Sequence, residues 1–342
     1  MKGAYLGKEV KTLLDFRPEQ GLDVSLQPLA ENKKRGSSAW HAGECVDNKE
    51  HARGQVQDTR AQVKDFAFWQ RAWQEERMVH LRSGKRGQDD AVKIWAKRSE
   101  DFIARVMKDT QRVEEVLDWL SNQGVRTQGM RILDIGSGPG TFTLPLAKEA
   151  AEVVAVEPVS NMVSHLKARL AEEKRGNVRI IKDTWEDVDI AAQSFSGRFD
   201  LVFASMSPGL SEWETVEKAL ACSRKYCYIS SFAGLRYNDH FRTLWQQIYG
   251  QEMPPWPADI IFIANLLLLR GYEITLHVWN KERSEELTQK EAREEFKKFF
   301  LTYAEEVPGL DDKISAHVGE NSSGGTFKHQ LITRLGKVLV RL

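Results

Sequence analysis

Cysteine is scarce in this sequence, and its scarcity excludes two kinds of protein. Only Cys45, Cys222 and Cys227 occur among the 342 residues. Three thiols cannot build a disulfide framework, nor can they supply all four ligands of a four-cysteine zinc site. We therefore expect buried or incidental thiols in a reducing compartment. No metal site is expected either, because the loop after the strand at 199–204 has no acid before Glu212.

A long hydrophobic run is also missing. The most apolar stretch, residues 260–269, is far shorter than the ~20 residues that a membrane-spanning helix needs. Residues 1–8 lack the apolar core of a signal peptide. We interpret 260–269 as a buried helix and expect a cytoplasmic protein with no membrane partner.

Neither sign of charge dominates the chain. Lys and Arg total 49, Asp and Glu also total 49, and the formal net charge is zero. A nucleic-acid binder usually carries a basic excess or stripe, so the balance argues against a nucleic-acid partner, although it is compatible with a local patch. The sequence carries no signal for an oligomeric state.

Changes in composition and residue spacing along the chain predict three regions. Residues 1–60 mix both charge signs with turn residues, so we expect a weakly structured extension or, alternatively, a segment that orders over a substrate. Apolar residues at helical spacing predict an N-terminal helical cap over 61–125. Residues 126–342 are expected to form one domain, with substrate-side insertions at about 236–272.

Short apolar runs and amphipathic stretches alternate beyond Met130, which predicts βαβ units and a parallel sheet. Strands are expected at 131–135, 152–157, 177–182, 199–204, 226–232 and 273–280, with a final pair at 326–334 and 337–342. Helices are expected at 140–150, 159–174, 187–193, 212–222, 238–250, 258–270 and 288–306.

A glycine-rich turn follows the first of these strands. Gly136, Gly138 and Gly140 have Gly-x-Gly-x-Gly spacing, which differs from the Gly-x-Gly-x-x-Gly fingerprint of dinucleotide sites. Glycines let the backbone approach a ligand, and the following helix offers free N–H groups. Asp134, just before the turn, can take an ammonium directly or through water. The pattern favours a ligand with an amino-acid moiety.

On these residues the sequence resembles the class I S-adenosylmethionine-dependent methyltransferases, over about residues 130–235. The resemblance implies S-adenosyl-L-methionine as cofactor. It implies a Rossmann-like, doubly wound α/β fold with a mostly parallel seven-stranded sheet, an antiparallel C-terminal strand and an N-terminal helical cap. The residues of the turn expected to bind the cofactor are Asp134, Gly136, Ser137, Gly138 and Gly140.

Further cofactor contacts are implied at the ends of the next strands. Glu157 ends the second strand and is expected to accept hydrogen bonds from both ribose hydroxyls. Pro158 and Met162 follow as in family members and are expected to flank the adenine. Ser205 lies at the carboxyl end of the fourth strand, where open α/β sheets bind ligands.

The third strand departs from the family pattern. Many members end it with an Asp that binds the adenine amino group, whereas Thr184 stands here and Asp183 comes one residue earlier. Adenine recognition is therefore expected to use Asp183, Thr184 or groups near Trp185. The Trp185 indole either covers the adenine or packs in the core.

No residue stands out as a catalyst, because an activated sulfonium needs mainly an aligned acceptor. The candidates His240 and Tyr237 follow the fifth strand, but either could instead cap the next helix or face solvent. The family's Asn/Asp-Pro-Pro-aromatic tetrapeptide and its pyrimidine-attacking cysteine pair are both absent. We expect in-line transfer to a small-molecule acceptor. The alternatives are transfer to RNA or protein, and a cofactor-binding subunit without catalysis of its own.

Tryptophan is the residue present in excess, with ten copies. Several lie outside the cofactor motif: Trp69, Trp73, Trp95, Trp213 and Trp256. We expect these tryptophans either to line an acceptor pocket or to pack in the core.

Overall fold

The computed structural model describes residues 62–82, 88–107, 109–304 and 307–342. The extension expected over 1–60 lies outside these residues. The boundaries expected for the helical cap and for the insertions remain predictions.

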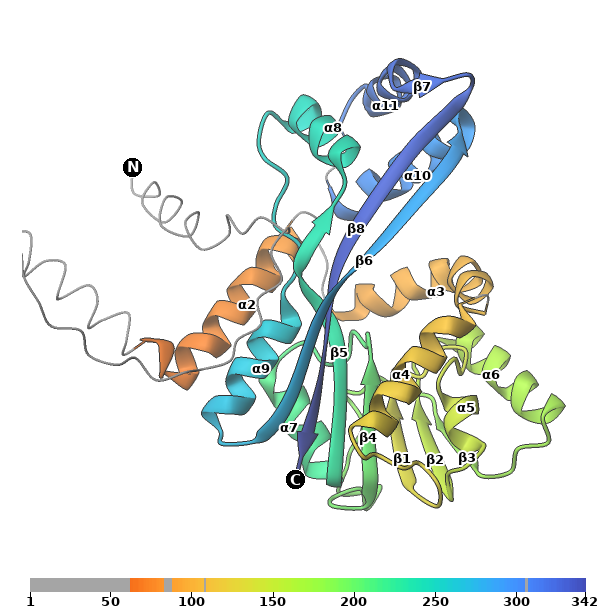
Figure 1. The fold of residues 1–342 in the computed structure, drawn as a ribbon, viewed down its shortest axis with the longest axis vertical. Helices are drawn as coiled ribbons and strands as arrows, with labels where there is room; N and C mark the ends of the chain where they lie inside the picture. Colours follow the sequence, from red (N-terminus) through yellow and green to blue (C-terminus); the bar gives the residue numbers. More distant parts are fainter. Residues whose placement is uncertain (1–61, 83–87, 108, 305–306) are drawn as a thin grey trace, which may run out of the picture. The chain divides into compact units, whose positions relative to one another are not determined.

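One mixed sheet organises the described part of the chain (Figure 1). Its order is β3-β2-β1-β4-β5-β8-β6, with the short β7 paired to β8. Strands β1 to β5 are parallel, and β8 runs antiparallel to both β5 and β6. The predicted Rossmann-like α/β fold class is therefore confirmed, although the described sheet has eight strands where seven were expected. The strands are β1 (Arg131–Ile135), β2 (Glu152–Val156), β3 (Val178–Ile181), β4 (Phe199–Ser205), β5 (Ser223–Tyr237), β6 (Glu273–Thr288), β7 (Ser322–Ser323) and β8 (Thr326–Arg341).

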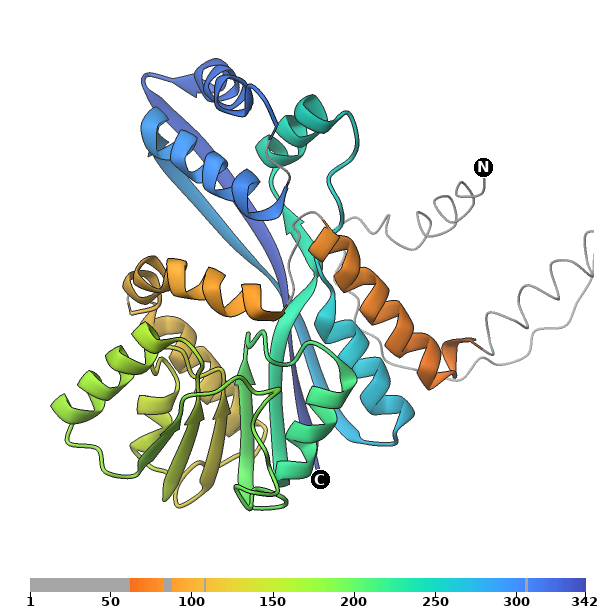
Figure 2. The same cartoon turned by 180° about the vertical axis from the view of Figure 1, so that it is seen from behind.

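Helices cover both faces of the sheet because side chains alternate between the faces along each strand. Ile132 packs with α4 (Thr110–Asn122) and α5 (Thr143–Ala147), and α6 (Ser160–Glu172) joins them on this face. The next residue, Leu133, packs on the opposite face. The helices there are α2 (Phe66–Arg82), α7 (Trp213–Cys222) and α9 (Asp259–Leu269). Figure 2 shows α2, α7 and α9 from behind.

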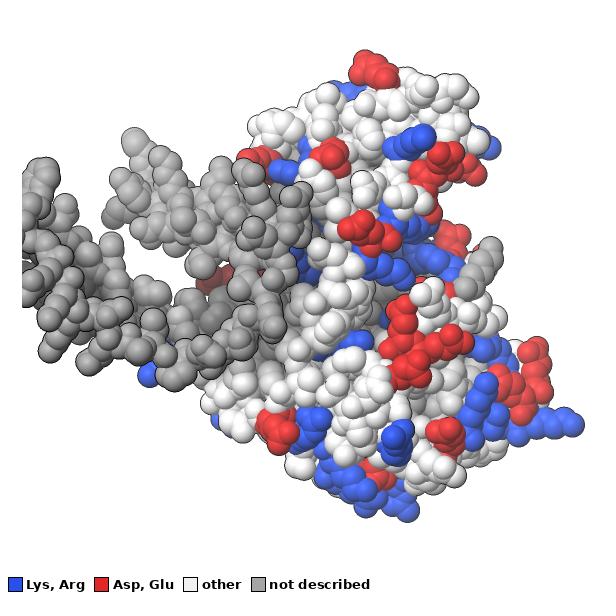
Figure 3. All heavy atoms as spheres, in the orientation of Figure 1, with Lys and Arg blue, Asp and Glu red and all other residues white. Residues whose placement is uncertain are grey.

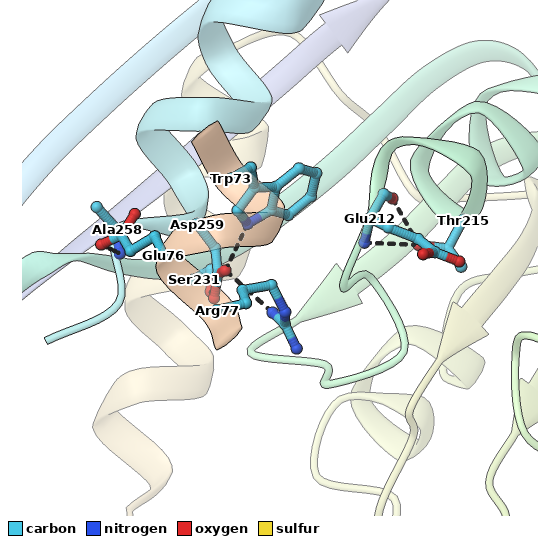
Figure 4. Close-up of polar contacts among 8 residues, drawn as sticks. All are labelled: Trp73, Glu76, Arg77, Glu212, Thr215, Ser231, Ala258 and Asp259. Atoms are coloured by element: carbon cyan, nitrogen blue, oxygen red, sulfur yellow. Dashed lines mark hydrogen bonds and ion pairs between the residues drawn. The ribbon is translucent and has the colours of Figure 1, made fainter. Parts of the chain in front are cut away.

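A buried polar network joins α2 to α9 and β5 (Figure 4). The Asp259 carboxylate accepts hydrogen bonds from Trp73 Nε1 at 2.8 Å, from Arg77 at 3.0 Å and from the Ser231 hydroxyl at 3.2 Å. Close by, Glu212 and Thr215 form the capping box that begins α7. The network fixes α2 against α9 and the middle of β5.

A second hydrophobic core surrounds the outer parts of β6 and β8. It is built from α8 (Asp239–Tyr249), α10 (Gln289–Tyr303) and α11 (Leu310–Glu320). Aromatic side chains fill it, and the rings of Phe241 and Phe299 stack with centroids 4.0 Å apart. In both views these helices lie apart from β1 and α5. Trp256 belongs to this core, while Trp73 and Trp213 belong to the core beneath α2, α7 and α9.

Several elements differ from the sequence-based expectation. The strands expected at 226–232 and 273–280 are longer and form β5 and β6, of 15 and 16 residues. Residues 326–341 form one continuous strand, because Gly336 stays within the ladders to β5 and β6 where a break was expected. Residues 187–193 form turns and no helix, and the Asp189 carboxylate accepts from the Ala191 and Ala192 N–H groups. The expected helix 288–306 is α10, and a further helix, α11, follows it.

The remaining helix, α3 (Gln88–Val106), packs against α6. Across the described residues, no helix has the length and apolar content needed to cross a membrane.

Candidate cofactor and acceptor site

The glycine turn after β1 is held open by its backbone conformation. Gly136, Gly138 and Gly140 have φ values of 73°, 55° and 86°, a region that L-residues rarely adopt. The Gly136 and Ser137 N–H groups donate to the Val156 carbonyl, which fixes the turn to β2. A Cβ on Gly136 would lie 2.4 Å from the Ser207 hydroxyl oxygen. Only glycine therefore fits between the turn and the loop after β4.

Glu157 lies beside this turn, directly after β2. Its carboxylate accepts from the Gly138 N–H at 2.9 Å and from the Val159 N–H at 2.8 Å. Burial raises the pKa of Glu157, and these two backbone hydrogen bonds oppose the rise. Each carboxylate oxygen keeps a further lone pair, so the group can still accept from a diol.

Asp134 is buried within β1, and its carboxylate accepts from the Thr143 hydroxyl at 2.6 Å. Burial raises the pKa of Asp134 to about 7. Its neighbour across the turn, Ser137, has a buried hydroxyl with no hydrogen-bond partner among the described residues. An orphaned buried hydroxyl in a turn of left-handed backbone fits a polar ligand such as the expected cofactor.

The residues expected near the adenine occupy different environments. Met162 is buried on α6, with its sulfur 3.8 Å from the position that a Gly138 Cβ would take, whereas Pro158 is half-buried. The half-buried Asp183 accepts from the N–H of Thr184, whose hydroxyl donates to Asp187. These four positions stay predictions as adenine contacts.

Trp185 packs in the core of the described structure. Its side chain is 2% exposed, and its indole N–H donates to the Thr215 carbonyl at 2.9 Å. The Lys218 ammonium lies 4.9 Å from the ring centroid and donates to the Trp185 carbonyl. Of the two roles that the sequence left open, this packing supports the structural one.

The carboxyl end of β4 and the neighbouring middle of β5 carry a cluster of hydroxyl groups. Ser205 Oγ lies 3.2 Å from Ser230 Oγ and accepts from the Arg112 guanidinium at 2.9 Å. The next residue, Met206, has a φ of 55° and directs the chain into the loop that contacts Gly136. Sequence reasoning missed Arg112 because it comes from α4, 93 residues before Ser205, and no local motif marks it. Ser230 could have been inferred from the register of two parallel strands.

His240 and Tyr237 are not brought to the glycine turn. His240 begins α8 in the second core, with its Nδ1 3.2 Å from His317 Nε2, and burial lowers its pKa. The Tyr237 hydroxyl donates to the Asp239 carboxylate. Both line a groove of about 590 Å³ between the start of α8 and the outer β6–β8 strands. Their catalytic assignment stays a prediction.

One group of potential metal ligands occurs among the described residues, in the second core. Ligand atoms of Glu285, Glu295 and His329 lie within 4.8 Å of one another. The Asn238 amide oxygen accepts from Phe241, so its NH₂ group faces His329 Nδ1 at 3.2 Å. His329 Nε2 then carries the proton and donates to Glu295 at 3.3 Å. The group is thus satisfied by its own hydrogen bonds.

The sequence is similar to known proteins, and the region matched by a family includes the glycine turn and Glu157. Residues 132–227 match the family described as methyltransferase domain. The probable ribosomal RNA small subunit methyltransferase A of Methanosphaera stadtmanae is 32% identical over 115 residues, which cover 34% of this chain and 37% of that protein. The 23S rRNA (uracil(1939)-C(5))-methyltransferase RlmD of Shewanella frigidimarina is 36% identical over 88 residues, 26% of this chain and 18% of that protein. The chain therefore spans only a minor part of each relative.

Two solved structures align over more of the chain at low identity. The YcgJ protein from Bacillus subtilis is 13% identical with a TM-score of 0.45, covering 65% of this chain and 95% of that one. Magnesium protoporphyrin IX methyltransferase from Synechocystis PCC 6803 is 16% identical with a TM-score of 0.39, covering 68% and 83% respectively.

The expectation that argued against a nucleic-acid partner is wrong, because both sequence relatives are named as ribosomal RNA methyltransferases. The physical reason is that net charge averages over the whole chain and carries no information on where the charges lie. Figure 3 shows Lys and Arg side chains gathered in a hollow between the β6–β8 strands and α3, despite the overall balance.

Proposed function

Residues 132–227 form a class I S-adenosylmethionine-dependent methyltransferase domain, and from this premise we propose that the chain transfers a methyl group to a nucleophilic atom of RNA. The observation that carries the transfer is Glu157, a buried carboxylate held beside the glycine turn by the Gly138 and Val159 N–H groups. This arrangement leaves lone pairs for a ribose diol and a backbone cradle for the rest of the cofactor.

Some residues of the site bind the methyl donor, and others position the acceptor. Bound S-adenosylmethionine supplies a methyl group already activated on a sulfonium. The glycine turn and Glu157 fix the nucleoside end, and the loop from Ser205 to Gly209 closes over the turn where Ser207 meets Gly136. The acceptor then needs to be held in line with the methyl carbon at the carboxyl ends of β4 and β5.

The relatives' names support RNA as the acceptor class, while the buried cysteines argue against one chemical route. Attack on a pyrimidine ring carbon uses a thiolate. Burial raises the pKa of Cys222 to about 12 and also raises that of Cys227, which is fully buried. Burial thus favours the protonated form of both described thiols, so we propose transfer to a nitrogen or oxygen atom without an adduct on Cys222 or Cys227; Cys45 lies outside the described residues.

The test is a labelled transfer with fractionated acceptors. The purified chain is incubated with methyl-labelled S-adenosylmethionine and with unmodified 16S and 23S transcripts, a protein extract or a metabolite extract in parallel. We expect label in ribonuclease-sensitive material, with at least about a tenfold loss in Gly136→Ala, whose Cβ would overlap Ser207. Gly176→Ala is the matched control, because a Cβ there meets no atom within 4 Å.

Label confined to the protein or metabolite fraction would contradict the RNA acceptor. Absence of S-adenosylhomocysteine binding by the wild-type chain would contradict the methyl transfer itself.

A further inference from the structure

Arg112 places a partly buried positive charge beside the carboxyl end of β4. Its guanidinium donates to Ser205 Oγ at 2.9 Å, and its central carbon lies 5.3 Å from the centroid of the Phe142 ring. Within the described part of the chain, no carboxylate oxygen lies within 4.0 Å of it. Guanidinium stays charged in proteins, and a charge removed from water needs a partner. A neutral serine hydroxyl satisfies one of its five N–H donors.

The groups around the guanidinium are hydroxyls that lack charged partners of their own. Ser205 and Ser230 lie side by side, with their hydroxyl oxygens 3.2 Å apart. The buried Tyr228 hydroxyl faces the same two serines without meeting hydrogen-bond geometry to either. Its ring stacks on Phe203 with centroids 4.7 Å apart, which fixes the direction of the hydroxyl toward the strand ends.

A second cation without an ion-pair partner belongs to the same part of the sheet. Lys337 on β8 is paired in register with Ser230 on β5 and is 7% exposed. Its ammonium lies 4.7 Å from the Trp119 ring centroid and 5.0 Å from that of Trp279. Among the described residues no carboxylate oxygen lies within 4.0 Å of it. This part of the sheet thus carries two positive charges with no carboxylate in ion-pair contact; the acids whose charges act on them, Asp109 and Glu115, lie beyond 4.0 Å.

We propose that Arg112, with Ser205, Ser230 and Tyr228, binds an anionic oxygen group, a carboxylate or a phosphate, of a molecule seated where the carboxyl end of β4 meets the middle of β5. The proposal rests on the proposed function and adds a binding residue to the same site. A forked guanidinium flanked by hydroxyl donors suits two oxygens of one anion. Two sources offer this chemistry: the methionyl carboxylate of the cofactor and a backbone phosphate of the RNA.

Calorimetry with two nucleoside ligands separates these sources. S-adenosylhomocysteine carries the carboxylate, whereas 5′-methylthioadenosine lacks the whole amino-acid portion. Both are titrated into the full wild-type chain, Arg112→Gln and Arg112→Lys, and binding of the 16S and 23S transcripts is measured by filter retention. Arg126→Gln, an exposed arginine just beyond the other end of α4, is the matched control. Circular dichroism and thermal melting verify that each variant is folded.

If the cofactor supplies the anion, Arg112→Gln binds S-adenosylhomocysteine about 10- to 100-fold more weakly, the usual cost of a charged hydrogen bond, and binds methylthioadenosine as before. If the RNA supplies it, transcript binding weakens by a similar factor and S-adenosylhomocysteine binding is unchanged. Arg112→Lys retains part of the affinity in either case, because the charge remains without the fork.

The proposal is overturned if folded Arg112→Gln binds all three ligands as the wild type does, or if Arg126→Gln loses as much affinity. Wild-type chain that binds neither nucleoside would instead overturn the proposed function. The two failures are therefore distinguishable.

Discussion

Glu76 shows how burial alters one residue of the network that holds α2. It accepts from the Ala258 N–H at 3.2 Å and lies close to the Asp259 carboxylate. Burial, and to a lesser extent the charge of Asp259, raises the pKa of Glu76 to about 7. An unfolded glutamate titrates near ~4.3, so between these values the folded chain binds more protons than the unfolded chain does.

Glu76 should therefore make the protein less stable as pH rises. Below about pH 4 the carboxyl group is protonated in both states and does not lower the free energy of unfolding. As pH rises through about 7, the group must ionise within the folded chain, and that stability is lost. We expect Glu76→Gln to raise the melting temperature relative to wild type by more at pH 8 than at pH 5. Thermal melts at both pH values measure this, with the exposed neighbour Glu75→Gln as control. An equal shift in melting temperature at both pH values would contradict a raised pKa of Glu76.

The cofactor residues that the sequence indicates are those joined by short stretches of chain. Asp134, the glycine turn and Glu157 follow two adjacent parallel strands, so a motif and a strand count suffice to bring them together. Arg112 could not be found in this way. Its position depends on how α4 packs over β4 and β5, and that packing joins residues far apart in the sequence.

Close packing between α9 and β8 depends on a single glycine. A Cβ on Gly336 would lie 2.5 Å from Ile260 Cγ2 and 3.1 Å from its Cγ1. We expect Gly336→Ala to destabilise the protein by about 1–3 kcal/mol, because the helix must move away from the sheet. Urea unfolding measures the change.

Gly319→Ala on α11 is the matched control, since its Cβ meets no atom within 4 Å and alanine favours a helix by up to about 1 kcal/mol. Equal effects of the two substitutions would contradict the packing role of Gly336.

At the level of elements, periodicity predicted most strands and helices of the parallel half. Periodicity gave the wrong element where contacts between distant residues determine the local structure. Gly336 resembles a break between two short strands, yet ladders on both sides keep β8 continuous. The apolar positions at 187–193 suggested a helix, but Asp189 captures two backbone N–H groups and stabilises a turn instead.

Cofactor binding should be visible as stability of the whole molecule. A ligand at about 100 times its Kd adds about 2.7 kcal/mol to the free energy of unfolding, which raises Tm by roughly 3–5 °C in a chain of this length. We expect saturating S-adenosylhomocysteine to give a rise of this order in wild type and in the control Glu173→Gln, whose carboxylate lies at the carboxyl end of α6 and faces Arg175 at 3.6 Å. At the same ligand concentration, Glu157→Gln should lose most of the rise, because the ribose loses its carboxylate. A full rise in Glu157→Gln would exclude Glu157 from the site.

The place of β8 in the sheet has a consequence for how the chain acquires its structure. β8 comes after every other strand in the sequence, yet it lies between β5 and β6. While the ribosome makes the chain, both neighbours emerge before the strand that joins them, so their facing edges stay unpaired until residues 326–341 are added. Long-range pairing of this kind folds slowly and exposes strand edges to self-association. The nascent chain is thus most prone to aggregate just before its final strand is complete.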